Sequence, residues 1–143
     1  MFEYKVKLER TLVSEDLVRF NNSSAVADLL VSRFGMRDEA QEVSYLILLD
    51  AALNVTGFQL ISRGSLNSTP MDFSVIFRTV FLSGCSRFMV THNHPAGPAD
   101  PSVEDMKITD QLKEAAAILR LDFLDHIIIG PNDSYSFAEH NWF

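Results

Sequence analysis

The sequence predicts an α/β fold in which a mixed β-sheet is flanked by helices, and two observations support this class. Apolar or alternating segments of strand length recur along the chain, and segments with helical spacing of apolar residues lie between them. The resulting order, β-α-β-β-α-β-α-β-β, places helices on the faces of a mixed sheet. With 143 residues and 47% apolar content, the chain is expected to form one domain spanning residues 1–143.

The first half of the chain contains strand and helix signals in turn. Apolar and charged side chains alternate over residues 2–8, which predicts a half-buried strand. Capping residues followed by helical spacing predict a helix over residues 22–35, ended by its terminal glycine. Continuous apolar or β-rich runs predict neighbouring strands over residues 43–50 and 55–63.

The second half contains the remaining helices and strands. Thr69-Pro70-Met71-Asp72 combines an N-cap, a proline at the first helical position and an acid at the third, which predicts a helix start. A short strand is expected over residues 88–91, and a helix is expected from Ser102. Strands over residues 123–129 and 135–137 complete the predicted sheet.

Charge and composition exclude several classes of protein. A net charge of −7 without clustered Lys or Arg disfavours nucleic-acid binding. No apolar stretch has the roughly 18 residues that a membrane span needs, and the first residues lack the apolar block of a signal peptide. Cys85 is the only cysteine, so no internal disulfide can form. We therefore expect a soluble, cytoplasmic protein.

Candidate metal ligands are concentrated between Thr91 and Asp105. His92 and His94 lie two residues apart at the end of a predicted strand, so both imidazoles should project to the same side. Asp105 follows after a loop rich in proline and glycine, which favours a compact turn that brings a third ligand back. The pattern predicts that these three side chains converge on one ion.

This ligand set favours a single catalytic zinc ion per chain. Two imidazoles and one carboxylate suit zinc, and three protein ligands leave the fourth tetrahedral position open. Such an ion brings the pKa of its bound water to roughly 7 and polarises a carbonyl, which is the chemistry of amide or ester hydrolysis. Ser102 could cap the following helix and also donate its proton to a substrate oxyanion.

Four motifs stand out in the second half of the chain. They are His92-Asn93-His94-Pro95, the spaced Ser102 and Asp105, Asp125-His126-Ile127-Ile128-Ile129-Gly130, and Ser136-Phe137-Ala138-Glu139. Together they resemble the RadC-like family, a bacterial branch of the JAMM (JAB/MPN) metalloproteases, and the resemblance covers most of the chain from about residue 23 onward. It implies a JAB/MPN domain with a cytidine-deaminase-like architecture and the activity of a zinc metalloprotease or isopeptidase.

The wider JAMM pattern includes an upstream glutamate that activates water and shuttles protons. The resemblance places this general base at Glu42, just before a predicted strand, with Glu39 as the alternative. The other histidines, His126 and His140, are interpreted as packed or surface residues and not as ligands.

The sequence also departs from the family pattern. Ala96 stands where RadC-like chains usually have serine, and Phe73-Ser74-Val75-Ile76 replaces a segment with basic and acidic residues. These changes leave the zinc ligands intact and affect the expected substrate contacts. The helix-hairpin-helix region of longer members is not part of this sequence, which weakens any implied DNA-repair role.

The leading hypothesis is therefore a zinc metalloprotease or isopeptidase that acts on a peptide or protein substrate. DNA and membranes are not expected partners, and the sequence does not determine the oligomeric state. One alternative is a non-catalytic MPN-type interaction module, and another is a DNA-processing protein of the kind that the family name suggests.

Overall fold

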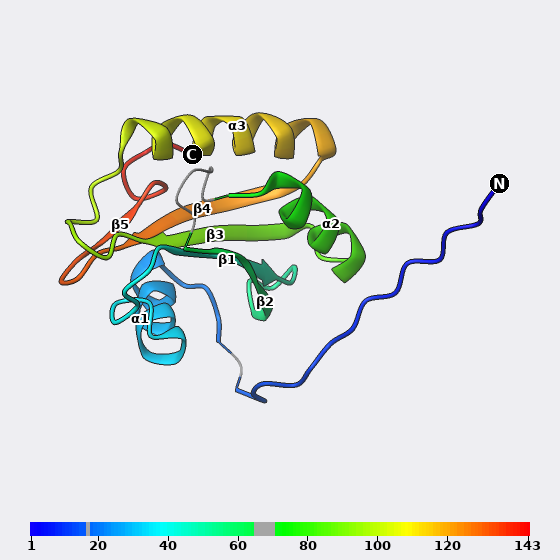
Figure 1. Ribbon diagram of the computed structural model, residues 1–143, viewed down its shortest axis with the longest axis horizontal. Coiled ribbons are helices and arrows are strands. Elements are labelled where there is room, and N and C mark those ends of the chain that lie inside the picture. Colours follow the sequence, from blue (N-terminus) through cyan, green and yellow to red (C-terminus); the bar gives the residue numbers. More distant parts are fainter. Residues whose placement is uncertain (17, 65–70) are drawn as a thin grey trace.

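The computed structural model is a five-stranded mixed sheet with helices on both faces (Figure 1). It describes residues 1–16, 18–64 and 71–143. The strands lie in the order β2-β1-β3-β4-β5, where β3 and β4 are parallel and the other neighbours are antiparallel. The predicted fold class is confirmed. The elements are α1 (Ser23–Phe34), β1 (Val43–Leu49), β2 (Val55–Arg63), α2 (Phe73–Ser83), β3 (Arg87–Asn93), α3 (Val103–Leu119), β4 (Asp122–Ile129) and β5 (Ser134–Ser136).

Two hydrophobic layers lie on opposite faces of the sheet. α1 covers one face, and α2 and α3 cover the other (Figure 1). Successive strand residues point to opposite faces, so the uninterrupted apolar runs of the central strands contribute to both layers. Leu46 packs on the α2 and α3 side, for example, while Ile47 packs beneath α1. None of the described helices is long and apolar enough to cross a membrane.

The first helix begins and ends at the residues that the sequence predicted. Asn22 is the N-cap, and its side-chain oxygen accepts a hydrogen bond from the amide of Ala25 at 2.8 Å. Gly35 follows the last helical residue with φ of 59°, a left-handed conformation that glycine adopts without steric cost. These local signals explain why the helix runs from Ser23 to Phe34.

The start of α2 differs from the prediction. Asp72 is the N-cap instead of the third helical residue, and its carboxylate accepts hydrogen bonds from the amides of Ser74 and Val75. One carboxylate thus satisfies two free amides at the positive end of the helix. The predicted N-cap Thr69 and the following Pro70 lie outside the described residues.

The predicted strand over residues 2–8 is wrong. These residues are exposed and lie outside the sheet, and Figure 1 shows the N-terminal segment running away from the folded body. The chain joins the body where the carbonyl of Val18 accepts from the amide of Val55 at 2.7 Å. Alternation defines an apolar face, but a strand forms only where the backbone finds a partner, and the described part of the chain provides none here.

Candidate metal site

Both histidines of the candidate site lie at one end of the central strand β3. His92 is within the strand and is paired with Ser44 of β1 and Ile128 of β4, while His94 follows the last strand residue. Their Nε2 atoms are 3.1 Å apart. The prediction that the two imidazoles project to the same side is confirmed.

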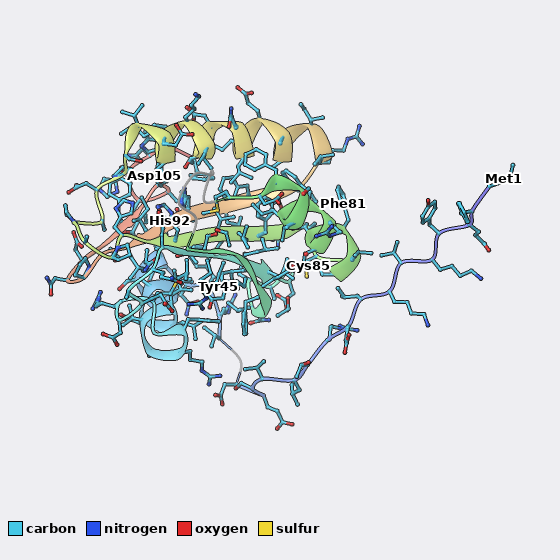
Figure 2. All side chains as sticks on the ribbon, viewed as in Figure 1. Met1, Tyr45, Phe81, Cys85, His92 and Asp105 are labelled. Atoms are coloured by element: carbon cyan, nitrogen blue, oxygen red, sulfur yellow. The ribbon has the colours of Figure 1, made fainter. Side chains whose placement is uncertain are left out.

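Asp105 completes the cluster from the first turn of α3. Its Oδ1 lies 3.1 Å from Nε2 of His92, and its Oδ2 lies 3.3 Å from Nε2 of His94. Figure 2 shows His92 and Asp105 at the same end of the sheet, between β3 and the start of α3. Zinc bonds of about 2.0–2.1 Å give tetrahedral edges of about 3.3 Å, and the two 3.1 Å distances from Nε2 of His92, to His94 and to Oδ1 of Asp105, are close to that value. The three side chains can hold a metal and leave its fourth position open.

The two carboxylate oxygens of Asp105 have different surroundings. Oδ2 accepts hydrogen bonds from the amide of Ser102 at 2.8 Å and from its hydroxyl at 2.7 Å. In return, the Ser102 hydroxyl oxygen accepts from the amide of Asp105, which completes the capping box that the sequence suggested. Oδ1 is left to face His92, so it is the oxygen best placed for a metal. The Ser102 proton points to Asp105 here, and a role at an oxyanion stays a prediction.

Each ligand histidine has a partner for its second ring nitrogen. Nδ1 of His94 donates to the carbonyl of Pro98 at 2.9 Å, and Nδ1 of His92 lies 2.9 Å from Nε2 of His126. His126 is buried and is not in the ligand cluster, as predicted, but the sequence reasoning missed its contact with His92. His140 is exposed and stacks on the ring of Tyr135 instead.

Charge and burial shift the pKa values of the cluster in different directions. Burial of Asp105 opposes ionisation, but hydrogen bonds from His92 and His94 outweigh it and hold the pKa of that carboxyl well below its ordinary value. The hydrogen bond to Asp105 is also the main cause of the raised pKa of His94. Burial, with repulsion from His92, lowers the pKa of His126 well below its ordinary value. At neutral pH, Asp105 is therefore ionised and His126 is neutral.

Asn93, between the two histidines, holds the segment that carries the candidate general base. Its side-chain oxygen accepts from the amide of Val43 at 2.7 Å, and its amide group donates to the carbonyls of Gln41 at 3.0 Å and Glu39 at 3.3 Å. Glu42 thus lies in a stretch of backbone that is fastened to the ligand strand on both sides. Contacts between residues about 50 positions apart could not be read from the sequence.

The two candidates for the general base lie in different surroundings. The Glu39 carboxylate forms an ion pair with Arg63, with 2.6 Å between the charged atoms. Glu42 is exposed, and its negative charge contributes to the raised pKa of His94, so it acts electrostatically on the ligand cluster. The choice of Glu42 as general base, with Glu39 as the alternative, stays a prediction.

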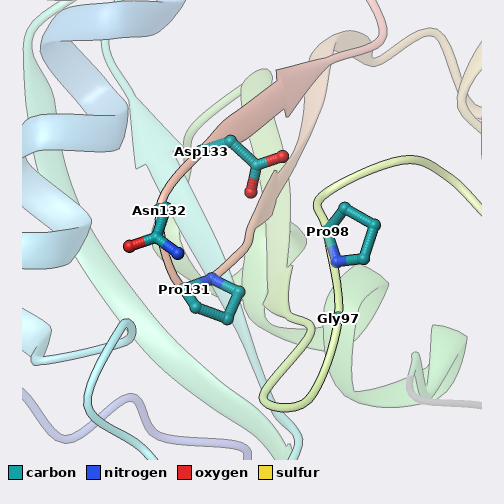
Figure 3. Close-up of a pocket in the computed structure, with 5 residues that line it drawn as sticks. All are labelled: Gly97, Pro98, Pro131, Asn132 and Asp133. Carbon is teal, nitrogen blue, oxygen red and sulfur yellow. The ribbon is translucent and has the colours of Figure 1, made fainter.

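The loop between the ligands is fixed by the turn between β4 and β5. Both carboxylate oxygens of Asp133 accept from the amide of Ala99 at 3.1 Å. A Cβ at position 130 would lie 2.1 Å from Oδ1 of Asp133 and 2.9 Å from the backbone nitrogen of Ala99, so a larger residue would displace both loops. These two loops form a depression of about 390 Å³ next to Pro98, whose carbonyl accepts from His94. Figure 3 shows the residues that line it. It is lined by Gly97, Pro98, Pro131, Asn132 and Asp133.

Asp125 stabilises the opposite face of β4. Its carboxylate accepts hydrogen bonds from the hydroxyls of Ser23 at 2.8 Å and Ser136 at 2.6 Å, and from the amide of Ala138 at 2.9 Å. Burial raises the pKa of Asp125, and these hydrogen bonds oppose that shift. The adjacent Asp125 and His126 thus serve different faces: Asp125 joins α1 to the C-terminal region, and His126 contacts the metal cluster.

Comparisons with known proteins agree with this geometry. A family profile described as the RadC-like JAB domain matches residues 20–142. UPF0758 proteins of Acinetobacter baylyi and Shewanella amazonensis are each 34% identical, over 87% and 95% of this chain and over 45% and 61% of their own lengths. One from Burkholderia cenocepacia is 33% identical over 90% of this chain and 49% of its own length. The chain thus spans about half the length of these relatives. It belongs to the RadC-like JAB domain family.

Proposed function

We propose that this protein is a zinc-dependent hydrolase, a metalloprotease or isopeptidase that cleaves a peptide-type bond with one zinc ion per chain. The observation that carries the proposal is the convergence of His92, His94 and Asp105 at the spacing of a zinc tetrahedron. Three protein ligands with an open fourth position are typical of catalytic zinc and not of structural zinc. Membership of a JAB-domain family supports the same chemistry.

The proposed mechanism gives each remaining residue a separate task. When bound, zinc would acidify water and polarise the substrate carbonyl. Glu42 would accept the proton of the attacking water and pass it to the leaving amine, acting as general base and then as general acid. The Ser102 hydroxyl, which donates to Asp105 in the structure, would turn its proton to the substrate oxyanion.

Charge supports a polypeptide and not a nucleic acid as the substrate. With a net charge of −7 and no cluster of Lys or Arg, the chain lacks the cations that release counterions from DNA, and this release dominates non-specific DNA affinity. The single free cysteine, Cys85, agrees with action in the reducing cytoplasm.

The test combines zinc content with hydrolysis of a library of peptides and isopeptides. We expect about one zinc per wild-type chain and loss of zinc in His92→Ala and Asp105→Ala. Glu42→Gln should keep the zinc and lower kcat by about 10²–10⁴-fold, because an amide cannot take the proton. Glu39→Gln is the matched control, since the Glu39 carboxylate pairs with Arg63, and it should retain both zinc and activity.

Other outcomes would each reject a defined part of the proposal. Full activity of Glu42→Gln would remove Glu42 from the mechanism, and loss of zinc in that variant would make it a ligand. Bound zinc without turnover of any library member would favour a non-catalytic interaction module. Metal-dependent cleavage of plasmid DNA that His94→Ala abolishes would favour a DNA-processing enzyme.

A further inference from the structure

A buried chain of hydrogen-bonding groups starts at the metal ligand His92 and passes through His126. Nδ1 of His92 lies 2.9 Å from Nε2 of His126, and Nδ1 of His126 lies 2.7 Å from the hydroxyl of Thr109. That hydroxyl in turn donates to the backbone carbonyl of Asp105 at 2.7 Å. The path therefore leads from one proposed metal ligand back to the residue that provides another. It crosses β3, β4 and α3, and its side chains are shielded from solvent.

The direction of the protons in this chain follows from the ligand role of His92. Nε2 of His92 faces Asp105 and must carry a lone pair when it binds a metal, so in the metal-bound protein the ring proton is on Nδ1. Nε2 of His126 must then be the acceptor, which leaves the proton of His126 on Nδ1, where it can donate to Thr109. The Thr109 hydroxyl oxygen accepts this hydrogen bond from His126, and the hydroxyl donates a second one to the backbone carbonyl of Asp105. With a metal on Nε2 of His92, every donor in this hydrogen-bonded series has an acceptor.

We propose that His126 is a positioning residue of the metal site, which holds His92 in the tautomer and ring orientation needed for binding zinc. The inference rests on the proposed function for the identity of the ion. The other ligand, His94, obtains the same support from the backbone carbonyl of Pro98, which no substitution removes. For His92 the acceptor is a side chain, so this support depends on the residue at position 126.

The packing around His126 fixes the ring in the required plane. Its ring stacks on Phe137 with the centroids 4.9 Å apart and the planes 6° apart. The Thr109 hydroxyl, held by its bond to the Asp105 carbonyl, fixes the rotation of the ring within that plane. Partners of this kind, which contact a ligand and not the metal, change metal affinity by about 10–100-fold when they are removed.

The decisive experiment compares the zinc affinities of two variants by competition with a chromophoric chelator. His126→Leu fills the space but accepts no hydrogen bond, and it should weaken zinc binding by about 10–100-fold. His126→Gln offers an oxygen to His92 and an amide hydrogen to Thr109, so it should bind zinc within a few-fold of wild type. Equal affinities for His126→Leu and wild type would overturn the proposal.

Two further measurements keep the test decisive if His126→Leu fails to fold. Thr109→Val should weaken zinc binding relative to wild type, while Thr109→Ser should restore it, and equal affinities of Thr109→Val and wild type would count against the proposal. In the zinc-loaded wild type, long-range ¹H–¹⁵N spectra should show both His92 and His126 as Nδ1–H tautomers. A proton on Nε2 of His126 would mean that the chain runs in the other direction, and would overturn the proposal.

The results distinguish this inference from the proposed function. Tight zinc binding that depends on position 126, without any peptide hydrolysis, would support the positioning role and reject the hydrolase. Hydrolysis by a His126→Leu protein with unchanged zinc affinity would support the hydrolase and reject the positioning role. A wild-type protein that binds no zinc would reject both.

Discussion

At the scale of single residues, His94 should determine how zinc binding responds to pH. Its hydrogen bond to Asp105 is the main cause of its raised pKa, burial opposes the shift, and the Pro98 carbonyl and the charge of Glu42 add to it. Without metal, His94 therefore keeps its proton to a higher pH than an ordinary histidine. Zinc has to displace that proton, whereas Asp105 is ionised throughout the neutral range because its pKa is lowered.

We expect the apparent zinc affinity to fall as the pH is lowered, beginning above the ordinary histidine pKa of about 6.5. The sign follows from competition, since protons occupy His94 more fully at each lower pH, and one displaced proton gives up to about tenfold per pH unit. Chelator competition between about pH 8 and pH 5.5 measures this dependence. Glu42→Gln should move its onset slightly to lower pH, because Glu42 is only a minor cause of the shift. A flat profile over this range would contradict the assignment of His94.

At the scale of elements, the start of α3 serves both the fold and the site. Ser102 and Asp105 form a capping box at the N-terminus of the helix, and the same hydrogen bonds direct Oδ2 of Asp105 away from His92. The negative carboxylate also lies at the positive end of the helix, which favours its charged form. Stability of the helix end and orientation of the metal ligand are therefore coupled.

Ser102→Ala should cost about 1 kcal/mol of stability and lower Tm by a few degrees, as the loss of an N-cap usually does. It should also weaken zinc binding, because Asp105 loses the hydroxyl that fixes its Oδ2. Thermal denaturation of the zinc-free protein isolates the first effect, and chelator competition measures the second. Ser102→Thr keeps the hydroxyl and should restore both. An unchanged Tm in Ser102→Ala would show that the cap contributes nothing.

The elements that the sequence predicted well are those with local signals at both ends. α1 has its cap and its left-handed glycine, and β2 coincides with the predicted range of residues 55–63. The strand over residues 2–8 was wrong because alternation does not specify a partner. α2 began later than expected because Asp72 competes for the role of cap, and both positions fit the same short motif.

The candidate site shows the same contrast between features with local sequence signals and features without them. The ligands His92, His94 and Asp105 lie within 14 residues of sequence, so strand periodicity and a proline-rich loop were enough to predict their convergence. The contacts of Asn93 with residues 39–43 and of His126 with His92 join segments 34–54 positions apart. No local pattern encodes such contacts.

At the scale of the whole molecule, the site depends on the mixed sheet. β3 is the central strand, antiparallel to β1 and parallel to β4, so one end of it meets the start of β1 and the end of β4. That arrangement brings Glu42, His92 and His126, which contacts His92, to the same end of the sheet. α3 then returns over the same face and adds Asp105 (Figure 1). The ligand cluster lies against the hydrophobic core, and its stability should follow that of the whole domain.

The N-terminal segment does not contribute to that core, and this leads to a prediction for the whole chain. Residues 1–13 are exposed, while the chain meets the body at Asp16, which pairs with Arg33, and at Val18, which accepts from Val55. Deletion of residues 1–13 should therefore leave Tm and zinc content unchanged. It should also make the protein less prone to associate, because alternate apolar side chains of the segment face solvent.

A longer deletion provides the matched control. Removing residues 1–20 also removes the backbone pairing of Val18 with β2 and the Phe20 side chain that packs against the α1 layer, so Tm should fall by several degrees. Differential scanning calorimetry of the full chain and the two deletion variants, all without zinc, measures these Tm values. A lower Tm after removal of residues 1–13 alone would mean that the segment packs on the body in solution. If this decrease in Tm instead varied with protein concentration, the segment would pack on a second copy of the chain, since stability gained by association depends on protein concentration.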